Sequence, residues 1–181
     1  MKIEATALPG VLLLTPAIYR DDRGAFSETF NLRQFAEAGL PTNWVQDNCS
    51  VSRKNVLRGI HYQVEQPQGK LVRVTYGAVL DVAVDLRRGS PGFGRHVAVE
   101  LSEDNGRMLW IPEGFGHAFL VLSEGAGFAY KVTDYYSPAG ERTILWNDSD
   151  LGICWPIAEE DAIVSAKDKK GARLREAEVF I

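Results

Sequence analysis

The chain has 181 residues, of which 45% are apolar and 24% are charged. These values are ordinary for a globular protein and argue against a disordered chain, a collagen or a coiled coil. The length predicts a single domain over residues 1–181 that can bury its core without disulfides. The 20 basic and 24 acidic residues leave a net charge of −4. This argues against nucleic acid as a partner but leaves an anionic small molecule open.

The sequence shows no sign of export or of membrane insertion. The apolar triplet Leu12–Leu14 is flanked by Pro9 and Pro16, and no run of about 18 apolar residues occurs anywhere. The two cysteines, Cys49 and Cys154, form neither a CxxC pair nor a disulfide framework. We therefore expect a cytoplasmic protein with reduced thiols and no membrane association.

Short apolar stretches separated by turn residues predict an all-β fold. Each stretch is rich in Val, Ile, Leu and aromatic residues, and Gly, Pro, Asn and Ser recur at intervals of about ten residues. Many short strands at this spacing indicate a sandwich or barrel, and we favour a jelly roll over an up-and-down barrel. The expected strands are 45–51, 56–62, 70–76, 79–86, 95–101, 108–111, 118–122, 128–136 and 143–146.

Helical signals are weak, so only short peripheral helices are expected. Asn31 is placed to cap a short helix that ends at Gly39, and a second helical turn is expected over 159–163. The pair Asn105-Gly106 is a typical hairpin turn and predicts that the strands on either side of it pair.

Two of the three histidines stand out, whereas His96 reads as a surface residue. The stretch ending at His117 has the spacing G-x5-P-x-G-x2-H and resembles the second motif of the cupin jelly rolls, whose His binds metal in the metal-containing members. The first cupin motif, H-x-H-x3–4-E, fails, because Gln63 stands two residues after His61 and no carboxylate follows at 67 or 68. Two imidazoles are too few for a metal site, so no metal is expected. A lone histidine such as His61 is more often structural than catalytic.

Alternation along two strands collects polar side chains on single faces. Such a face is either exposed to solvent or lines a polar pocket in the mouth of a barrel, and the pattern alone leaves both readings open. Asp81 interrupts the apolar run 79–86, so a buried side chain with a hydrogen-bonded partner is expected. The two polar faces are Gln46, Asn48 and Ser50 in one strand and Tyr130, Val132, Asp134 and Tyr136 in another.

A longer series of motifs runs in order along almost the whole chain. It includes D-D-R-G-A-F-S-E at 21–28, Q-D-N at 46–48, N-V-L-R-G-I-H-Y-Q at 55–63, Q-G-K-L-V-R at 68–73, W-I-P-E-G-F-G-H-A-F at 110–119, Y-K-V-T-D-Y-Y-S-P at 130–138 and S-A-K-D at 165–168. Together these motifs resemble the dTDP-4-dehydrorhamnose 3,5-epimerase family, the cupin-like enzymes of dTDP-L-rhamnose synthesis. One departure is Cys49, where the family leads us to expect His; alternation points this position away from the face of Asn48.

The resemblance implies an epimerase that acts on a dTDP-linked 4-keto-6-deoxy sugar without a metal or redox cofactor. The C3 and C5 protons of such a sugar both lie α to the C4 carbonyl. The chemistry is then deprotonation to an enolate and reprotonation from the opposite face. It requires a base, an acid across the ring and stabilisation of the enolate oxygen.

The resemblance also assigns roles to individual residues. His61 is the expected base, since imidazole titrates near neutral pH, and Asp168 orients it. Tyr130 is the expected proton donor, and Lys70 the cation for the C4 oxyanion. The expected substrate-binding residues are Arg23, Glu28, Gln46, Asp47, Asn48, Arg58, His117, Tyr136, Glu141 and Lys167, with Asp81 in support of His117.

In the family, the segment that carries Arg23 and Glu28 is lent to the active site of another subunit. The resemblance therefore implies a homodimer with exchange of N-terminal segments. Three alternatives remain: an epimerase for C3 or C5 alone, or a ketoisomerase, on a related sugar; a non-catalytic binder of sugar nucleotides; and a metal-dependent cupin.

Overall fold

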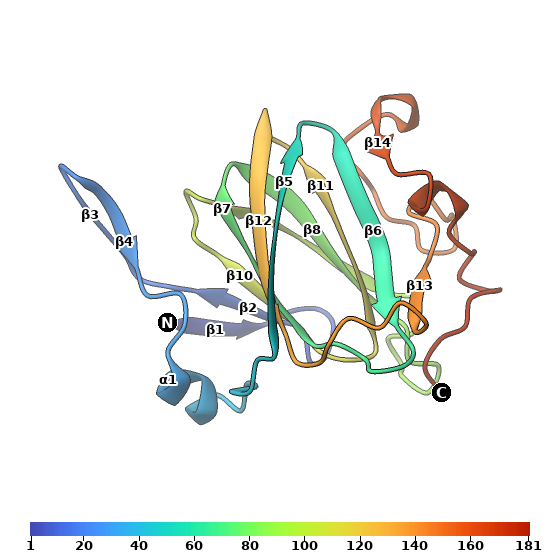
Figure 1. Ribbon diagram of the computed structural model, residues 1–181, viewed down its shortest axis with the longest axis horizontal. Helices are drawn as coiled ribbons and strands as arrows, with labels where there is room; N and C mark the ends of the chain where they lie inside the picture. The colour runs from blue at the N-terminus through green and yellow to red at the C-terminus, as the bar shows by residue number, and fades with distance from the viewer.

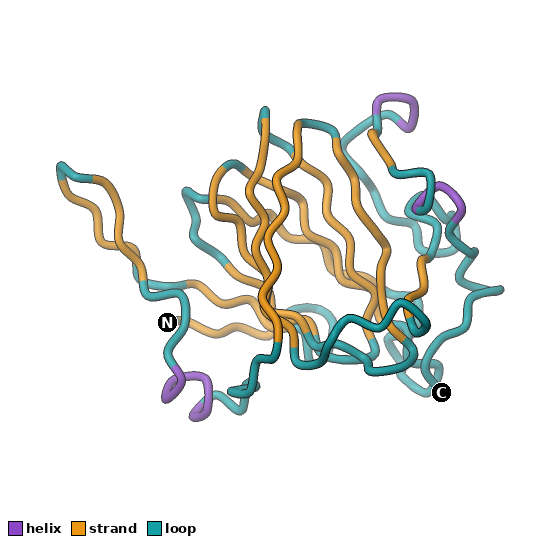
Figure 2. Tube along the Cα trace, viewed as in Figure 1, coloured by secondary structure: helices purple, strands orange, loops and turns teal.

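Two six-stranded sheets face each other in the computed structural model, which describes residues 1–181 (Figures 1 and 2). Every strand pair in the first sheet is antiparallel. In order across this sheet, the strands are β1 (Lys2–Ala5), β2 (Leu12–Thr15), β10 (Met108–Ile111), β7 (Lys70–Tyr76), β12 (Gly125–Val132) and β5 (Gln46–Arg53).

The second sheet is antiparallel except for one short strand at its edge. That strand, β14, pairs in parallel with β6. The other five, in order, are β13 (Glu141–Thr143), β6 (Val56–Gln63), β11 (Phe115–Val121), β8 (Ala78–Asp85) and β9 (His96–Ser102), with β14 at Ile163–Val164. This two-sheet arrangement confirms the expected all-β, cupin-like jelly roll.

Apolar side chains are buried on both faces of the second sheet. Phe119 of β11 and Phe128 of β12 stack across the space between the sheets, with ring centroids 4.2 Å apart. On the other face, Ile60 and Val82 pack with apolar side chains of the C-terminal segment, such as Leu174. Burial on both faces explains why the central strands β8 and β11 are nearly continuous apolar runs rather than alternating ones.

Four short elements lie outside the two sheets. The hairpin of β3 (Ile18–Asp21) and β4 (Gly24–Ser27) projects away from the body of the molecule (Figure 1). The helix α1 (Leu32–Glu37) begins where the Asn31 side chain accepts hydrogen bonds from two backbone amides, as expected. Two 3-10 turns follow at Glu159–Asp161 and Asp168–Lys170. No helix has the length and apolar character needed to cross a membrane.

The structure corrects two expectations about local pairing. Asn105-Gly106 does form a turn, with Gly106 at a φ of 60°, but β9 and β10 on either side belong to different sheets and do not pair. The turn therefore carries the chain from one sheet to the other instead of closing a hairpin. The strand expected over 128–136 ends at Val132, so Asp134 and Tyr136 lie in the loop after it and do not share a strand face with Tyr130.

The sequence analysis missed the strands β1 to β4. In β1 and β2 each strand has four residues and Pro9 and Pro16 lie close by, so no run was long enough to indicate a strand. The two strands of the projecting hairpin also have four residues each, and Gly24 after its turn adopts a φ of 128°.

Candidate active site

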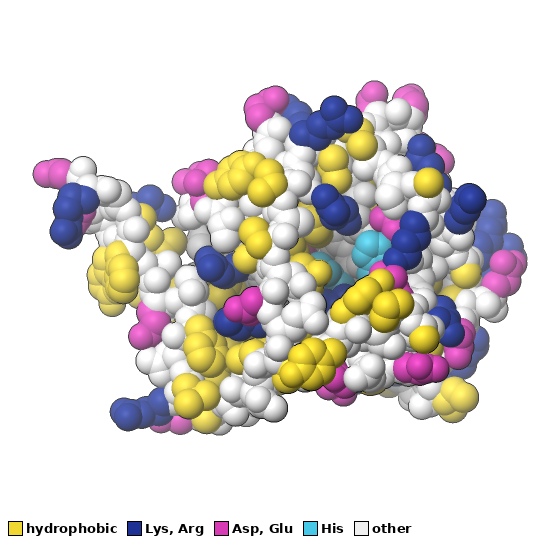
Figure 3. Space-filling model, in the orientation of Figure 1, with side chains coloured by type: hydrophobic (Ala, Val, Ile, Leu, Met, Phe, Trp, Pro, Cys, Tyr) yellow, Lys and Arg dark blue, Asp and Glu magenta, His cyan; other side chains and the backbone are white.

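A cavity of about 360 Å³ opens between the two sheets. Its lining comes from β5, β7 and β12 of one sheet and from β6, β11 and β13 of the other, so both sheets contribute walls. Figure 3 shows a hollow on this face with histidine at its bottom and Lys or Arg side chains around it. The residues that line it are Asn48, Cys49, Ser50, Arg58, His61, Tyr62, Gln63, Gln68, Lys70, His117, Phe119, Phe128, Tyr130, Tyr136 and Glu141.

His61 on β6 is held from behind by a buried carboxylate. Its Nε2 lies 2.7 Å from Oδ1 of Asp168, whose Oδ2 also accepts a hydrogen bond from the Gly59 amide at 3.2 Å. Burial alone would raise the pKa of Asp168, but the hydrogen bonds from His61, Gly59 and Ser165 outweigh it and hold the pKa below its ordinary value. The carboxylate is therefore ionised at neutral pH and can only accept, so Nε2 donates.

A second histidine–aspartate pair lies deeper in the cavity. His117 of β11 is the direct cross-strand neighbour of His61, and its Nε2 lies 2.9 Å from Oδ2 of Asp81 on β8. Its ring stacks against Phe128 with centroids 5.8 Å apart. Asp81 is fully buried, as expected, and its other oxygen has no hydrogen-bond partner. The pair fixes the ring plane of His117 at the bottom of the cavity.

Lys70, at the start of β7, is a buried cation on the wall opposite the two histidines. Its Nζ lies 3.4 Å from the backbone oxygen of His61, and only 8% of the residue is exposed. Burial lowers the pKa of Lys70 to about 8, although the charges of Asp81 and Glu141 partly offset this effect. The ammonium group therefore persists at neutral pH, with few partners in the protein to satisfy it.

Tyr130 of β12 also projects from the sheet opposite His61. Burial raises the pKa of Tyr130, while the nearby charge of Arg58 pulls it down and that of Glu141 pushes it up. The phenol is consequently protonated across the physiological range and can act as a proton donor. Arg58 itself donates from Nε to the Ser52 hydroxyl at 3.1 Å, which leaves the end of its guanidinium free to bind an anion.

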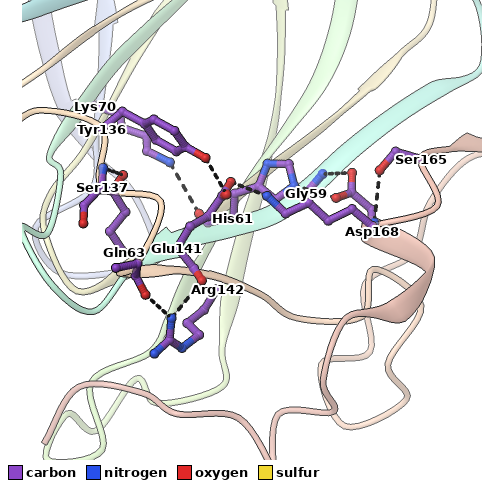
Figure 4. A network of polar contacts seen from close by, with 12 residues as sticks. Gly59, His61, Gln63, Lys70, Tyr136, Ser137, Glu141, Arg142, Ser165 and Asp168 are labelled. Carbon is purple, nitrogen blue, oxygen red and sulfur yellow. Dashed lines mark hydrogen bonds and ion pairs between the residues drawn. The ribbon is translucent and has the colours of Figure 1, made fainter.

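Glu141 of β13 connects two segments at the rim of the cavity (Figure 4). Its Oε2 accepts a hydrogen bond from the Tyr136 hydroxyl at 2.8 Å, and its Oε1 pairs with the ammonium group of Lys167. Burial opposes ionisation of Glu141, but the bonds from Lys167 and Tyr136 lower its pKa overall. The same hydrogen bond to Glu141 raises the pKa of Tyr136.

No group of three or more His, Cys, Asp or Glu side chains is arranged to hold a metal ion. The two histidines of the cavity each point one nitrogen at an aspartate, and Gln63 stands where a further histidine ligand would be needed. The cavity thus offers a cation, a phenol and two imidazoles rather than a ligand set.

Comparisons with known proteins identify the family. The family model described as dTDP-4-dehydrorhamnose 3,5-epimerase matches residues 5–176. This chain belongs to that family. A relative of that name from Pseudomonas aeruginosa is 52% identical over 181 residues, which is 99% of each chain.

Solved structures agree with this assignment to the dTDP-4-dehydrorhamnose 3,5-epimerase family. A dTDP-6-deoxy-D-glucose-3,5-epimerase from Legionella pneumophila, in complex with dTDP-4-keto-L-rhamnose, has a TM-score of 0.94 and 48% identity, and the match covers 98% of this chain and 94% of that one. A 3'-monoepimerase from Streptomyces bikiniensis, in complex with dTDP-quinovose, has a TM-score of 0.88 and 36% identity and covers 94% and 86%.

Most of the residues that the family resemblance singled out meet at the cavity. Asp168 and Asp81 lie directly behind His61 and His117, and Gln46 and Lys167 bond to lining residues. The predicted residues in the lining itself are Asn48, Arg58, His61, Lys70, His117, Tyr130, Tyr136 and Glu141.

Three predicted substrate-binding residues lie away from the cavity of their own chain. Arg23 is exposed on the projecting hairpin and pairs with Asp21, and Glu28 accepts hydrogen bonds from the region of α1. Asp47 is exposed and pairs with Lys131 at 3.0 Å. Alternation explains why Asp47 lies outside the cavity. The residues on either side of it on β5, Gln46 and Asn48, point inward, so Asp47 points outward.

The sequence analysis missed several residues of the lining. Gln63 follows His61 by two positions on β6, so the same alternation that linked Gln46 with Asn48 could have placed it in the cavity. No sequence pattern marked Phe119 and Phe128 as cavity residues, because an aromatic residue in a strand is usually part of the hydrophobic core. Cys49 belongs to the exposed side of β5, as expected, although it also borders the cavity.

Proposed function

We propose that the protein is a dTDP-4-dehydrorhamnose 3,5-epimerase that inverts C3 and C5 of dTDP-4-dehydro-6-deoxy-D-glucose. The observation that carries the proposal is that His61 and Tyr130 come from facing sheets and line one cavity. A base on one wall and an acid on the other can remove a proton from one side of a sugar ring and return one to the opposite side. Inversion requires that arrangement.

In the first step, His61 takes the proton from carbon. Because ionised Asp168 accepts from Nε2, the neutral imidazole carries its lone pair on Nδ1. The C–H bond breaks, the proton moves to Nδ1, and the electron pair passes through the adjacent carbon to the C4 oxygen. Asp168 stabilises the imidazolium that forms.

The enolate oxygen needs a positive charge or hydrogen-bond donors close to it. Lys70 supplies an ammonium group from a buried position, where an electrostatic interaction is stronger than in water. The ring of His117, oriented by Asp81, contacts the substrate from the cavity bottom.

In the second step, Tyr130 donates its phenolic proton to the carbon from the opposite face. The configuration is thereby inverted, and the C4 carbonyl re-forms as the electron pair returns to carbon. Solvent then reprotonates the tyrosinate and takes the proton from His61. Both C3 and C5 are α to the same carbonyl. His61, Asp168, Lys70 and Tyr130 therefore serve both carbons once the ring shifts between steps.

Arg58 and the polar face of β5 supply the contacts for the nucleotide. The free end of the Arg58 guanidinium is suited to the diphosphate. Asn48 and Gln46, which bond to each other at 2.8 Å, offer amide groups, and the ring of Tyr136 offers a flat surface for thymine. A related protein from Legionella pneumophila binds dTDP-4-keto-L-rhamnose.

Proton exchange in deuterated water tests the proposed reaction. A double epimerase incorporates deuterium at both C3 and C5 of the 4-keto-6-deoxy sugar, and a coupled downstream reductase identifies the product. Exchange at C3 alone would instead place the protein with the 3'-monoepimerase that it also resembles. Tight dTDP binding without any exchange would indicate a non-catalytic binder.

Lys70 is expected to set the alkaline limb of the pH profile of kcat/KM. Its pKa of about 8 means that kcat/KM falls as pH rises through that value, because the neutral amine no longer stabilises the oxyanion. Tyr130, with a pKa raised above its ordinary value, does not produce this limb. The Lys70→Arg variant should lose the limb near pH 8, since a guanidinium group stays protonated up to about pH 12. An unchanged limb in that variant would remove Lys70 from this role.

We further propose that two chains form a dimer in which each lends its β3–β4 hairpin to the other. The hairpin makes little contact with its own chain, and Tyr19 and Phe26 on it are 67% and 69% exposed. Exposed aromatic side chains on a projecting two-stranded hairpin are costly in water and favour a partner surface. Arg23 at its tip would then reach the diphosphate in the partner's cavity.

Mixed dimers of two variants with weakened dTDP binding distinguish this arrangement from a self-contained site. Arg58→Ala and Arg23→Ala should each weaken dTDP binding about ten- to a hundredfold, as expected for lost charge-assisted hydrogen bonds. Co-expression of the two variants creates dimers in which one of the two cavities has both arginines. Roughly a quarter of the wild-type sites should therefore return in a random mixture. Activity no higher than that of the separate variants would contradict the exchange of hairpins.

A further inference from the structure

The side-chain amide of Gln63 forms three hydrogen bonds, all to backbone groups of two loops. Only 5% of the residue is exposed. Its Nε2 donates to the Gln66 oxygen at 2.8 Å and to the Tyr135 oxygen at 3.2 Å, and its Oε1 accepts from the Ser137 amide at 3.0 Å. One side chain thus joins the loop after β6 to the loop after β12.

These bonds bracket Tyr136, the aromatic residue at the cavity rim (Figure 4). Tyr136 is 52% exposed, so core packing does not fix its ring. Its own hydrogen bonds run from its backbone N–H to Oε1 of Gln46 at 3.3 Å and from its hydroxyl to Oε2 of Glu141. Because Gln63 binds the residues immediately before and after Tyr136, it sets the backbone from which the ring projects.

Gln63 occupies the position at which metal-containing cupins carry a second histidine. In this structure its side chain instead forms hydrogen bonds to the backbone of two loops. Two carbonyl oxygens and one amide face the side chain, so the site needs two donors and one acceptor on a single group. Glutamine supplies this set. An ionised glutamate would direct an oxygen at two carbonyls, and an apolar residue would leave all three groups unpaired.

We infer that Gln63 is a positioning residue that holds Tyr136 in place for the nucleobase of dTDP. The inference rests on the proposed function, because it takes thymine as the group that Tyr136 contacts. Gln63 lies on the same strand and the same face as His61, yet it acts on the nucleotide end of the substrate. Its loss should therefore affect binding of the nucleotide far more than the proton transfers.

Calorimetric titration of dTDP into matched variants tests the inference. Gln63→Met and Gln63→Glu should each weaken dTDP binding about tenfold, the order expected when buried hydrogen bonds are lost. Both should raise KM while kcat at saturating substrate stays near the wild-type value. Gln66→Ala is the control, because its exposed side chain makes only a 3.4 Å hydrogen bond to Asp134, while its backbone oxygen, the partner of Gln63, remains. It should bind dTDP as the wild type does.

A double-mutant cycle shows whether Gln63 acts through Tyr136. Tyr136→Ala removes the ring, so Gln63→Met should cost little additional dTDP affinity in that background. Additive losses would overturn the inference, and so would a fall in kcat with unchanged dTDP affinity. If Gln63→Met does not fold, Gln63→Glu, which retains the shape and the acceptor, takes its place in the cycle.

The same titrations separate failure of the inference from failure of the proposed function. A wild-type protein that does not bind dTDP would contradict the proposed function. A wild-type protein that binds dTDP, together with Gln63 variants that bind it equally well, would contradict only the role of Gln63.

Discussion

Replacing His61 with Ala should abolish deuterium exchange at both C3 and C5 while dTDP binding stays nearly intact. A positioned base contributes about 10²–10⁴-fold to a proton transfer, and the cavity offers no second imidazole with a free route to the same protons, since His117 lies below and is bound to Asp81. The side chain of His61 is 32% exposed, so its removal leaves no core void. Exchange measured by NMR for each carbon separately checks the prediction.

A matched control for this variant is His96→Ala. His96 lies on β9, outside the residues that line the cavity, so its removal should leave exchange and product formation unchanged. Asp168→Asn should also lower exchange at both carbons, because the amide can donate to Nε2 and hold the wrong imidazole tautomer, and it carries no charge to stabilise the imidazolium. If either carbon still exchanges at the wild-type rate in His61→Ala, a second base exists.

Short apolar stretches separated by turn residues were sufficient to predict much of the fold. The break in the apolar run 79–86 marked Asp81 as buried and paired, and the structure confirms this. Alternation grouped Gln46 with Asn48, which the structure also confirms. It failed beyond Val132, because the chain leaves the sheet there and Tyr136 reaches the cavity from a loop. A pattern with a period of two carries no information about where a loop returns.

Local residue patterns do not predict contacts between segments that lie far apart in the sequence. Asp168 lies 107 residues after His61 in a charge-rich segment that reads as a solvated surface, and only the family resemblance singled it out. The pairing of Asn105-Gly106 was misjudged for a related reason. A turn motif specifies local backbone geometry, whereas the sheet that receives each flanking strand depends on which apolar faces bury each other.

Replacing Tyr130 with Phe should separate proton removal from inversion. The ring and its packing against Phe128 remain, and His61 and Asp168 are untouched, so the enolate still forms. The donor on the opposite face is lost. A proton must then come from water, which is slow, or return from His61, which restores the starting configuration. The variant should therefore retain some deuterium exchange but form much less epimerised product.

The ratio of exchange to product is the quantity that decides the role of Tyr130. Return of the same proton from His61 hides part of the exchange, so the exchange rate alone understates enolate formation. A ratio well above the wild-type value assigns Tyr130 to reprotonation, because only the second step has slowed. Equal loss of exchange and product would assign it to binding or to stabilisation of the enolate instead. Normal product formation would remove Tyr130 from the reaction, and the protonated phenol on the wall facing His61 would then need another explanation.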